Sequence, residues 1–211
     1  MKLLIVAATR AELGDFFVRF NLPEKEFIEN DTFDLLITGV GMTATAFQLG
    51  QHLNQKYDLV LNVGIAGSFD LGIPLGSLIS VETDIIAELG AEDHDQFIAI
   101  DELGFGENTF KATYSITDLP KVKAITVNKV HGNAVSIASM KQRLSPEIES
   151  MEGAAVFYAC NLLQVKCAQV RSVSNYVEPR ARENWKIGLA IKNLNEWLIN
   201  FVQLTTTSQV L

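Results

Sequence analysis

Three carboxylates and one carboxamide stand where apolar segments of the chain end, and these side chains are the best placed to do chemistry. Glu12 lies one turn after the first apolar run, where a carboxylate can take a proton from water. Glu149 and Glu152 lie just before or at the start of an apolar helical segment, and a carboxylate there can accept hydrogen bonds from two vicinal hydroxyls. Asn175 follows the apolar run of residues 170–173, at the kind of position where an open α/β sheet presents its working groups.

Each of these side chains also has a purely structural explanation. Thr9-x-x-Glu12 fits a capping box, in which the Thr hydroxyl and the Glu carboxylate close the first helical turn. The helix dipole stabilises a carboxylate near a helix N-terminus, which is sufficient to explain Glu149 or Glu152. An Asn in a loop can bond to its own backbone, as Asn175 would. Taken singly, each segment leaves both explanations open.

Two glycine-rich segments follow apolar runs, TGVGMTA at residues 38–44 and NVGIAGS at residues 62–68. Gly39-x-Gly41-x-x-Ala44 satisfies the loose dinucleotide fingerprint, but the next predicted strand carries Asp58 at its start and no acidic residue at its end, where a ribose would need one. Dinucleotide binding is therefore an alternative and not the first choice. No P-loop motif is present, which argues against an NTP-hydrolysing site.

No residue pattern predicts a metal ion or any other cofactor. The histidines are scattered and lack ligand spacing: His52, His94 and His131. Cys160 and Cys167 have neither a Cys-x-x-Cys spacing nor a nearby His, so we expect reduced core thiols in a cytoplasmic protein.

Composition narrows the class of partner. The formal net charge is −8 and no Lys/Arg cluster occurs, which argues against a nucleic-acid surface or a polybasic membrane anchor and favours a small-molecule substrate. No window approaches the ~18 apolar residues of a membrane span, and the apolar start of the chain is typical of a first strand rather than of a signal peptide. With 211 residues, 48% of them apolar, we expect one domain over 1–211 with a frayed tail at about 205–211.

Strand-like and helical segments alternate along the chain, which predicts βαβ units and a largely parallel sheet. The predicted strands cover residues 2–8, 33–38, 59–63, 78–81, 122–127 and 168–173. The predicted helices cover residues 10–20, 43–55, 135–143, 153–163 and 186–204.

Taken together and in this order, the segments IVAATRAE, TGVG, NVGIAGS, ESMEGAA and VRSVSN resemble the nucleoside phosphorylase/hydrolase superfamily. Within it, DIIAELGAEDHDQFIAIDELGF and SNYVEPRARENW are most similar to the futalosine hydrolases of menaquinone biosynthesis. The resemblance implies a three-layer αβα sandwich with a central mixed sheet, and a homodimer or higher homo-oligomer, because relatives complete each pocket with a neighbour's loop.

The resemblance also implies roles for individual residues. Glu12 matches the carboxylate that activates water, while Met151 and Glu152 match the pair that packs under the ribose and accepts its hydroxyls. Ala66 and Gly67 match the loop that lines the nucleophile side. The phosphorylases of the family carry an arginine for phosphate around such loops, whereas NVGIAGS has none, so we expect water to be the nucleophile.

Asn175 departs from the adenine-specific nucleosidases, which have Asp at this position. A carboxylate would repel O6 of a 6-oxopurine, whereas an amide can donate to O6 and accept from N7–H. The expected reaction is therefore hydrolysis of futalosine to hypoxanthine and dehypoxanthine futalosine. Arg180, with Arg182 and Trp185 near it, is a candidate partner for the aromatic carboxylate of futalosine.

Two other functions stay open on the sequence. One is the same chemistry on an adenine nucleoside, either methylthioadenosine/S-adenosylhomocysteine or aminodeoxyfutalosine. The other, from a different class, is a non-catalytic dinucleotide- or nucleoside-binding regulator built on the Gly39–Gly41 loop.

Overall fold

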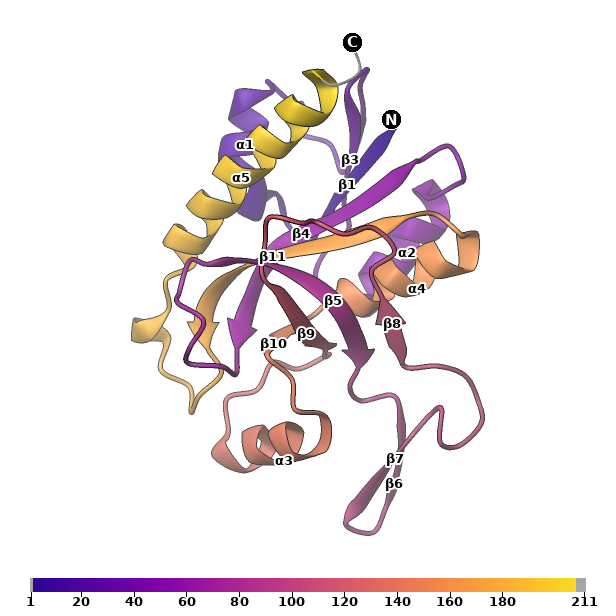
Figure 1. Cartoon of the computed structure of the whole chain (residues 1–211), viewed down its shortest axis with the longest axis vertical. Helices are drawn as coiled ribbons and strands as arrows, with labels where there is room; N and C mark the ends of the chain where they lie inside the picture. Colours follow the sequence, from indigo (N-terminus) through magenta and orange to yellow (C-terminus); the bar gives the residue numbers. More distant parts are fainter. Residues whose placement is uncertain (1, 208–211) are drawn as a thin grey trace.

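Nine strands of the described chain form one mixed sheet in a computed structural model that describes residues 2–207 (Figure 1). Their order is β10-β9-β5-β11-β4-β1-β3-β2, and β8 pairs with β5. The strands are β1 Leu3–Ala7, β2 Phe27–Glu29, β3 Phe33–Ile37, β4 Leu59–Ser68, β5 Leu78–Ile86, β8 Thr109–Lys111, β9 Lys121–Thr126, β10 Ile148–Ser150 and β11 Cys167–Tyr176. A separate hairpin consists of β6 Gly90–Asp93 and β7 Gln96–Ala99.

The centre of the sheet is parallel, as the alternating pattern predicts. β1 pairs in parallel with β3 and β4, and β4 pairs in parallel with β11. β5 runs antiparallel to β11 but parallel to β9, which makes the sheet mixed. The carboxyl ends of β1, β4 and β11 therefore lie at the same edge of the sheet.

Helices cover both faces of the sheet. They are the 3₁₀ turn η1 Arg10–Leu13, α1 Gly14–Arg19, α2 Met42–His52, α3 Ala134–Leu144, α4 Gly153–Leu163, the 3₁₀ turn η2 Arg182–Asn184 and α5 Ile187–Thr207. Figure 1 shows α1 beside α5 on one face and α2 beside α4 on the other. Each pair closes its own apolar core: Phe16 and Leu194 belong to one, Leu49 and Phe157 to the other. The predicted three-layer αβα architecture is confirmed.

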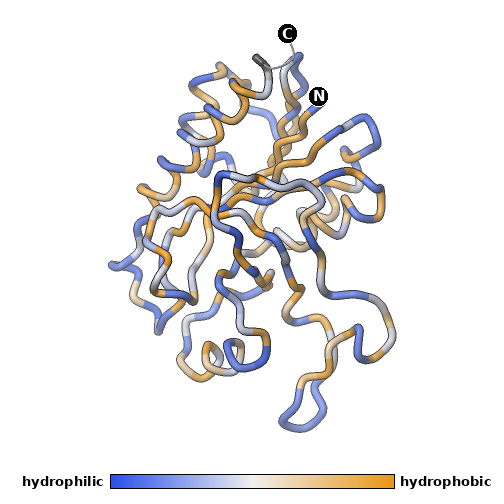
Figure 2. The backbone as a smooth tube through the Cα atoms, in the orientation of Figure 1, coloured by the Kyte–Doolittle hydropathy of each residue, from blue (hydrophilic) through white to orange (hydrophobic). Residues whose placement is uncertain are grey.

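Hydropathy follows these layers. Figure 2 shows apolar colour along the central strands, and alternating colours along α5, which has an apolar side against the sheet and a polar side away from it. The β6–β7 hairpin projects from the body, and all residues of β6 are exposed. Within residues 2–207, no helix is both long and apolar enough to cross a bilayer.

Three strands are longer than their apolar runs predict. β5 continues from residue 81 to Ile86. β4 continues from residue 63 to Ser68, and β11 continues from residue 173 to Tyr176. β4 and β11 remain paired to their ends, with Asn175 opposite Gly67 and an irregularity in register after Val173. Asn175 therefore lies in a strand and not in the predicted loop, because the backbone pairs even where the side chains become polar.

Other elements also differ from their predicted bounds. The predicted helix over 10–20 is a 3₁₀ turn followed by the short α1, and Glu149 lies in strand β10, not in or next to a helix. The helix predicted over 153–163 is confirmed, with Glu152 as its N-cap. α5 continues to Thr207, so residues 205–207 of the predicted frayed tail are helical, and the rest of that tail lies outside the described residues.

Candidate active site

A cavity of about 370 Å³ opens at the carboxyl ends of β1, β4 and β11. Six residues predicted from the sequence line it: Glu12, Ala66, Gly67, Met151, Glu152 and Asn175. They come from η1, from the end of β4, from the start of α4 with the residue before it, and from the end of β11. The parallel arrangement of β1, β4 and β11 brings these distant segments to one edge of the sheet.

Glu12 is buried, with 8% of its surface exposed, and both of its carboxylate oxygens accept hydrogen bonds. Oε2 accepts from the backbone N–H and the hydroxyl of Thr9, each at 3.0 Å, so the capping contact exists. Oε1 accepts from the backbone N–H of Ile65 in β4 at 3.1 Å. The carboxylate is thus held from two sides at the cavity wall, and the capping and functional explanations apply to the same side chain.

Arg171 is buried close to Glu152 of the cavity and was not singled out from the sequence. It is 1% exposed, and its guanidinium donates to Gln169 at 2.8 Å and to Asn62 at 2.6 Å. A Cβ added to Gly64 would collide with this guanidinium and lie 3.0 Å from Oε1 of Glu12. The available signal was that Arg171 is the one charged residue of the buried strand β11.

Glu152, the N-cap of α4, contacts both the Gly39–Gly41 loop and β11. Its Oε1 accepts from the backbone N–H of Gly41 at 2.9 Å, and its Oε2 lies 3.8 Å from Nη1 of Arg171. Gly41 has a φ of +95°, a conformation that glycine adopts readily. The Gly39–Gly41 loop therefore turns its N–H toward a carboxylate of this site, which disfavours the dinucleotide interpretation.

Asn175 has one donor and one acceptor left for a ligand. Its Oδ1 accepts from the hydroxyl of Ser174 at 2.8 Å, and its Nδ2 donates to the carbonyl of Tyr176 at 3.1 Å. A carboxamide has two N–H groups and two oxygen lone pairs, so one of each is free. A Cβ on Gly67 would lie 3.1 Å from Nδ2, which means that the absence of a side chain there makes room beside the amide.

Glu149 and His131 form a buried pair at the same cavity. The sequence pointed to Glu149 but not to His131 or to the contact between them. Oε1 of Glu149 accepts from the backbone N–H of His131 at 2.9 Å, and Oε2 lies 2.6 Å from Nδ1 of the ring. Their side chains are 3% and 5% exposed. Burial raises the pKa of Glu149, and the hydrogen bonds from His131 oppose that rise. The pairing of β10 with its neighbours brings the two residues together, and nothing in their spacing predicts it.

Arg180 is the predicted site residue that does not line the cavity. Its guanidinium lies over the ring of Trp185, 5.2 Å from the ring centre, and that of Arg182 lies 5.6 Å from it. Trp185 itself lines the cavity. Both arginines are exposed, and neither lines the cavity.

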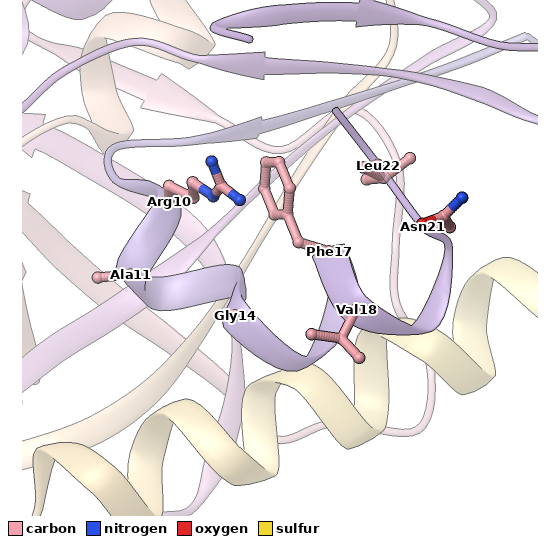
Figure 3. A pocket seen from close by; sticks show the side chains of 7 residues that line it. All are labelled: Arg10, Ala11, Gly14, Phe17, Val18, Asn21 and Leu22. Atoms are coloured by element: carbon pink, nitrogen blue, oxygen red, sulfur yellow. The ribbon is translucent and has the colours of Figure 1, made fainter. Parts of the chain in front are cut away.

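A second hollow lies on the outer side of η1 and α1 (Figure 3). Arg10 lines it, pairs with Glu24 at 2.9 Å and lies 4.7 Å from the ring centre of Phe17. Arg10, the arginine nearest to Glu12 in the sequence, therefore makes its contacts outside the cavity that Glu12 lines.

The described residues that line the cavity around Glu12 include neither arginine nor lysine. In the described part of the chain, no group of three or more His, Cys, Asp or Glu residues could hold a metal ion.

The chain matches the Phosphorylase superfamily over residues 28–209. The futalosine hydrolase of Streptomyces coelicolor is 34% identical over 180 residues, which cover 79% of this chain and 77% of that protein. The futalosine hydrolase of Thermus thermophilus is 27% identical over 174 residues, 77% of each chain.

Solved structures agree with the fold. 5′-Methylthioadenosine/S-adenosylhomocysteine nucleosidase of Helicobacter pylori has a TM-score of 0.81 at 16% identity, covering 96% of this chain and 98% of its own. Futalosine hydrolase of the same organism has a TM-score of 0.79 at 15% identity, covering 96% and 97%. The match to the family over most of the chain and the 34% identical relative show that the chain belongs to the phosphorylase superfamily, as a glycosidic hydrolase.

Proposed function

We propose that the protein hydrolyses the N-glycosidic bond of futalosine and releases hypoxanthine and dehypoxanthine futalosine. The observation that carries the proposal is the carboxamide of Asn175, with one N–H and one lone pair free, in the same cavity as Glu12 and Glu152. This pair of groups complements O6 and N7–H of a departing 6-oxopurine. The names of the curated relatives support the same substrate.

The proposed roles follow from the positions of the side chains. The bond between C1′ and N9 breaks, and the ribosyl centre becomes oxocarbenium-like. Glu12 deprotonates the water that attacks C1′, because its carboxylate is fixed at the cavity wall by Thr9 and Ile65. Glu152 accepts hydrogen bonds from the ribose hydroxyls and Met151 packs under the sugar, beside Ala66 and Gly67.

Water is the proposed nucleophile even though the superfamily includes phosphorylases. A phosphate bound beside C1′ needs cationic partners such as arginine, and the described lining of the cavity includes neither arginine nor lysine. Arg10 is paired with Glu24 outside the cavity, and Arg171 already donates to Gln169 and Asn62.

A substrate panel tests the proposal. The protein is incubated in parallel with futalosine, aminodeoxyfutalosine, methylthioadenosine and NAD, and free base is followed by chromatography. We expect hypoxanthine from futalosine and little adenine from the adenine nucleosides, because Asn175 is no carboxylic acid. Preferential release of adenine would assign the protein to the adenine nucleosidases, and binding without turnover of any nucleoside would favour a regulator.

We also propose a homodimer, by analogy with the superfamily. Exposed apolar side chains lie around a groove between α2, the loop before β8 and α4, among them Phe47, Phe105 and Tyr158. Burying such side chains favours association. Light scattering of the purified protein should give twice the mass of one chain, and a monomer over the micromolar range would contradict this.

A further inference from the structure

The proposed reaction leaves one proton unassigned, and the inference below rests on that proposed function. When the bond between C1′ and N9 breaks, its electron pair goes to the purine, which leaves readily only if it gains a proton. Glu12 takes a proton from water and so cannot supply this one. The amide of Asn175 can donate a hydrogen bond but does not ionise near neutral pH. A separate acid is needed at the purine end of the cavity.

His131 has the geometry of such an acid. Its Nδ1 lies 2.6 Å from Oε2 of Glu149, which fixes the ring and directs the other nitrogen, Nε2, away from the carboxylate. Among the residues that the structure describes, Nε2 has no hydrogen-bond partner. His131 lines the cavity, so Nε2 is the ring nitrogen that remains for a ligand there.

The pair stands next to Asn175 at one end of the cavity. Glu149 pairs with Gly67 across β10 and β4, and Gly67 is also the partner of Asn175 across β4 and β11. A Cβ on Gly67 would lie 3.1 Å from Nδ2 of Asn175 and 3.6 Å from Cγ of Glu149. The carboxamide and the Glu149–His131 pair thus flank the same glycine from opposite sides.

Glu149 also fixes the position of the ring. Its Oε1 accepts from the backbone N–H of His131 and its Oε2 lies 2.6 Å from Nδ1, so the carboxylate holds both the backbone and the ring of this residue. No other side chain of the described residues bonds to the ring, and Phe69 packs near it with its ring centre 6.1 Å away.

We propose that His131, oriented by Glu149, is the general acid that protonates the departing purine. The proton on Nε2 passes to a purine nitrogen as the bond between C1′ and N9 breaks, and the electron pair of that bond remains on the neutral base. Water forms the new bond to C1′ and gives its proton to Glu12. Exchange with solvent then returns the proton from Glu12 to water and restores the proton on His131.

The test compares leaving groups that need a proton with one that does not. 4-Nitrophenyl β-D-riboside releases a stable phenolate, so its cleavage does not depend on a general acid. His131→Asn keeps a donor to Glu149 but removes Nε2, and its kcat on futalosine should fall by about 10²-fold or more. On the nitrophenyl riboside the same variant should stay within about threefold of the wild-type protein.

Two further variants serve as controls for this comparison. His131→Gln places an amide that can hydrogen-bond but cannot transfer a proton, and it should behave as His131→Asn does. His94→Asn is the matched control, because His94 is 95% exposed on the β6–β7 hairpin with a φ of +55° that Asn tolerates. This control should match the wild-type protein on both substrates.

Equal losses on both substrates would overturn the proposal, as would full activity of His131→Asn on futalosine. If the wild-type protein does not cleave the nitrophenyl riboside, His131→Ala is assayed on futalosine with added imidazole, which can replace the missing ring. Restored turnover supports the role of His131 as general acid, and no restoration counts against it. Failure of the wild-type protein to cleave futalosine would instead contradict the proposed function, so the two failures are distinguishable.

Discussion

At the scale of single residues, Glu12 performs two tasks with one carboxylate. Its hydrogen bond from Thr9 closes the first turn of η1, and its hydrogen bond from Ile65 ties that turn to β4. The capping contact therefore orients the side chain that we propose as the base. Sequence reasoning found Glu12 because the capping motif and the family motif coincide, and only the contact to Ile65 had no sequence signal.

Glu12→Gln should lower kcat on futalosine by at least ~10²-fold, because it keeps the shape of the side chain and removes the base. Both carboxylate oxygens accept from backbone N–H groups, so the amide nitrogen of Gln must face one donor, and the melting temperature should fall modestly. Steady-state kinetics and thermal melts of the two proteins check this. Normal turnover with a lower melting temperature would mean that capping is the whole role of Glu12.

Asn175→Asp should reduce turnover of futalosine, because a carboxylate beside O6 is repelled by it. The change also places a negative oxygen against the carbonyl of Tyr176, which now accepts from Nδ2. Weak cleavage of an adenine nucleoside should appear in the variant. The ratio of hypoxanthine to adenine release, measured by chromatography for both proteins, checks the prediction, and faster futalosine turnover by the variant would contradict the assigned role.

At the scale of elements, the ends of β4, β10 and β11 create the site, and these ends were the least predictable part of the fold. The apolar runs locate the centres of β4 and β11, but glycine and polar residues interrupt the apolar pattern toward the end of each strand, among them Gly67 and Asn175, which line the cavity. β10 has only three residues and gives too short a pattern to identify. The Glu149–His131 pair depends on β10, which explains why the sequence did not reveal it.

The loop between β11 and α5 carries the next prediction. Arg180 and Arg182 lie over Trp185, which lines the cavity, so a carboxylate leaving the cavity past this ring would meet a guanidinium. A charge-assisted hydrogen bond contributes roughly 1.5–3 kcal/mol, so alanine at the right arginine should lower kcat/KM for futalosine by about 10- to 150-fold. Inosine lacks the carboxylate and is the control substrate. If both arginines can be replaced without a selective loss on futalosine, the carboxylate is bound elsewhere.

A buried polar chain beneath the site links β5 to β11 and predicts a pH dependence of stability. Asp84 accepts from Gln169 at 2.9 Å and from Thr126 at 2.8 Å, and burial raises its pKa to about 6. The unfolded value is about 3.9. Because the folded pKa is the higher one, the folded state binds this proton more tightly, and the resulting stability is present below pH ~4 and lost as pH rises through ~6.

Asp84→Asn removes that titration. The free energy of unfolding of the wild-type protein, relative to that of the variant, should therefore fall between pH ~4.5 and ~7. Denaturant melts of both proteins across this range check it, since the other titrating groups are common to both. Parallel profiles, or a relative gain by the wild-type protein as pH rises, would contradict the assignment.

At the scale of the whole molecule, the order of segments determines how the site is assembled. Parallel β1, β4 and β11 bring Glu12, Gly67 and Asn175 to one edge, and α4 adds Glu152 from its N-cap. This arrangement could be predicted because the alternation of strands and helices is strong along the chain. The short strands β2, β6, β7 and β8 could not, because they are polar or only three to four residues long. They lie away from the cavity, so missing them did not affect the site.

The most direct test of the central claim is the identity of the products formed from futalosine in H₂¹⁸O, with and without added phosphate. Mass spectrometry should detect hypoxanthine and a free sugar that carries one ¹⁸O at C1′, at the same rate in both reactions. This result follows from a water molecule activated by Glu12 in a cavity whose described lining includes neither arginine nor lysine. A sugar 1-phosphate that accumulates when phosphate is added, or no release of hypoxanthine at all, would contradict the account.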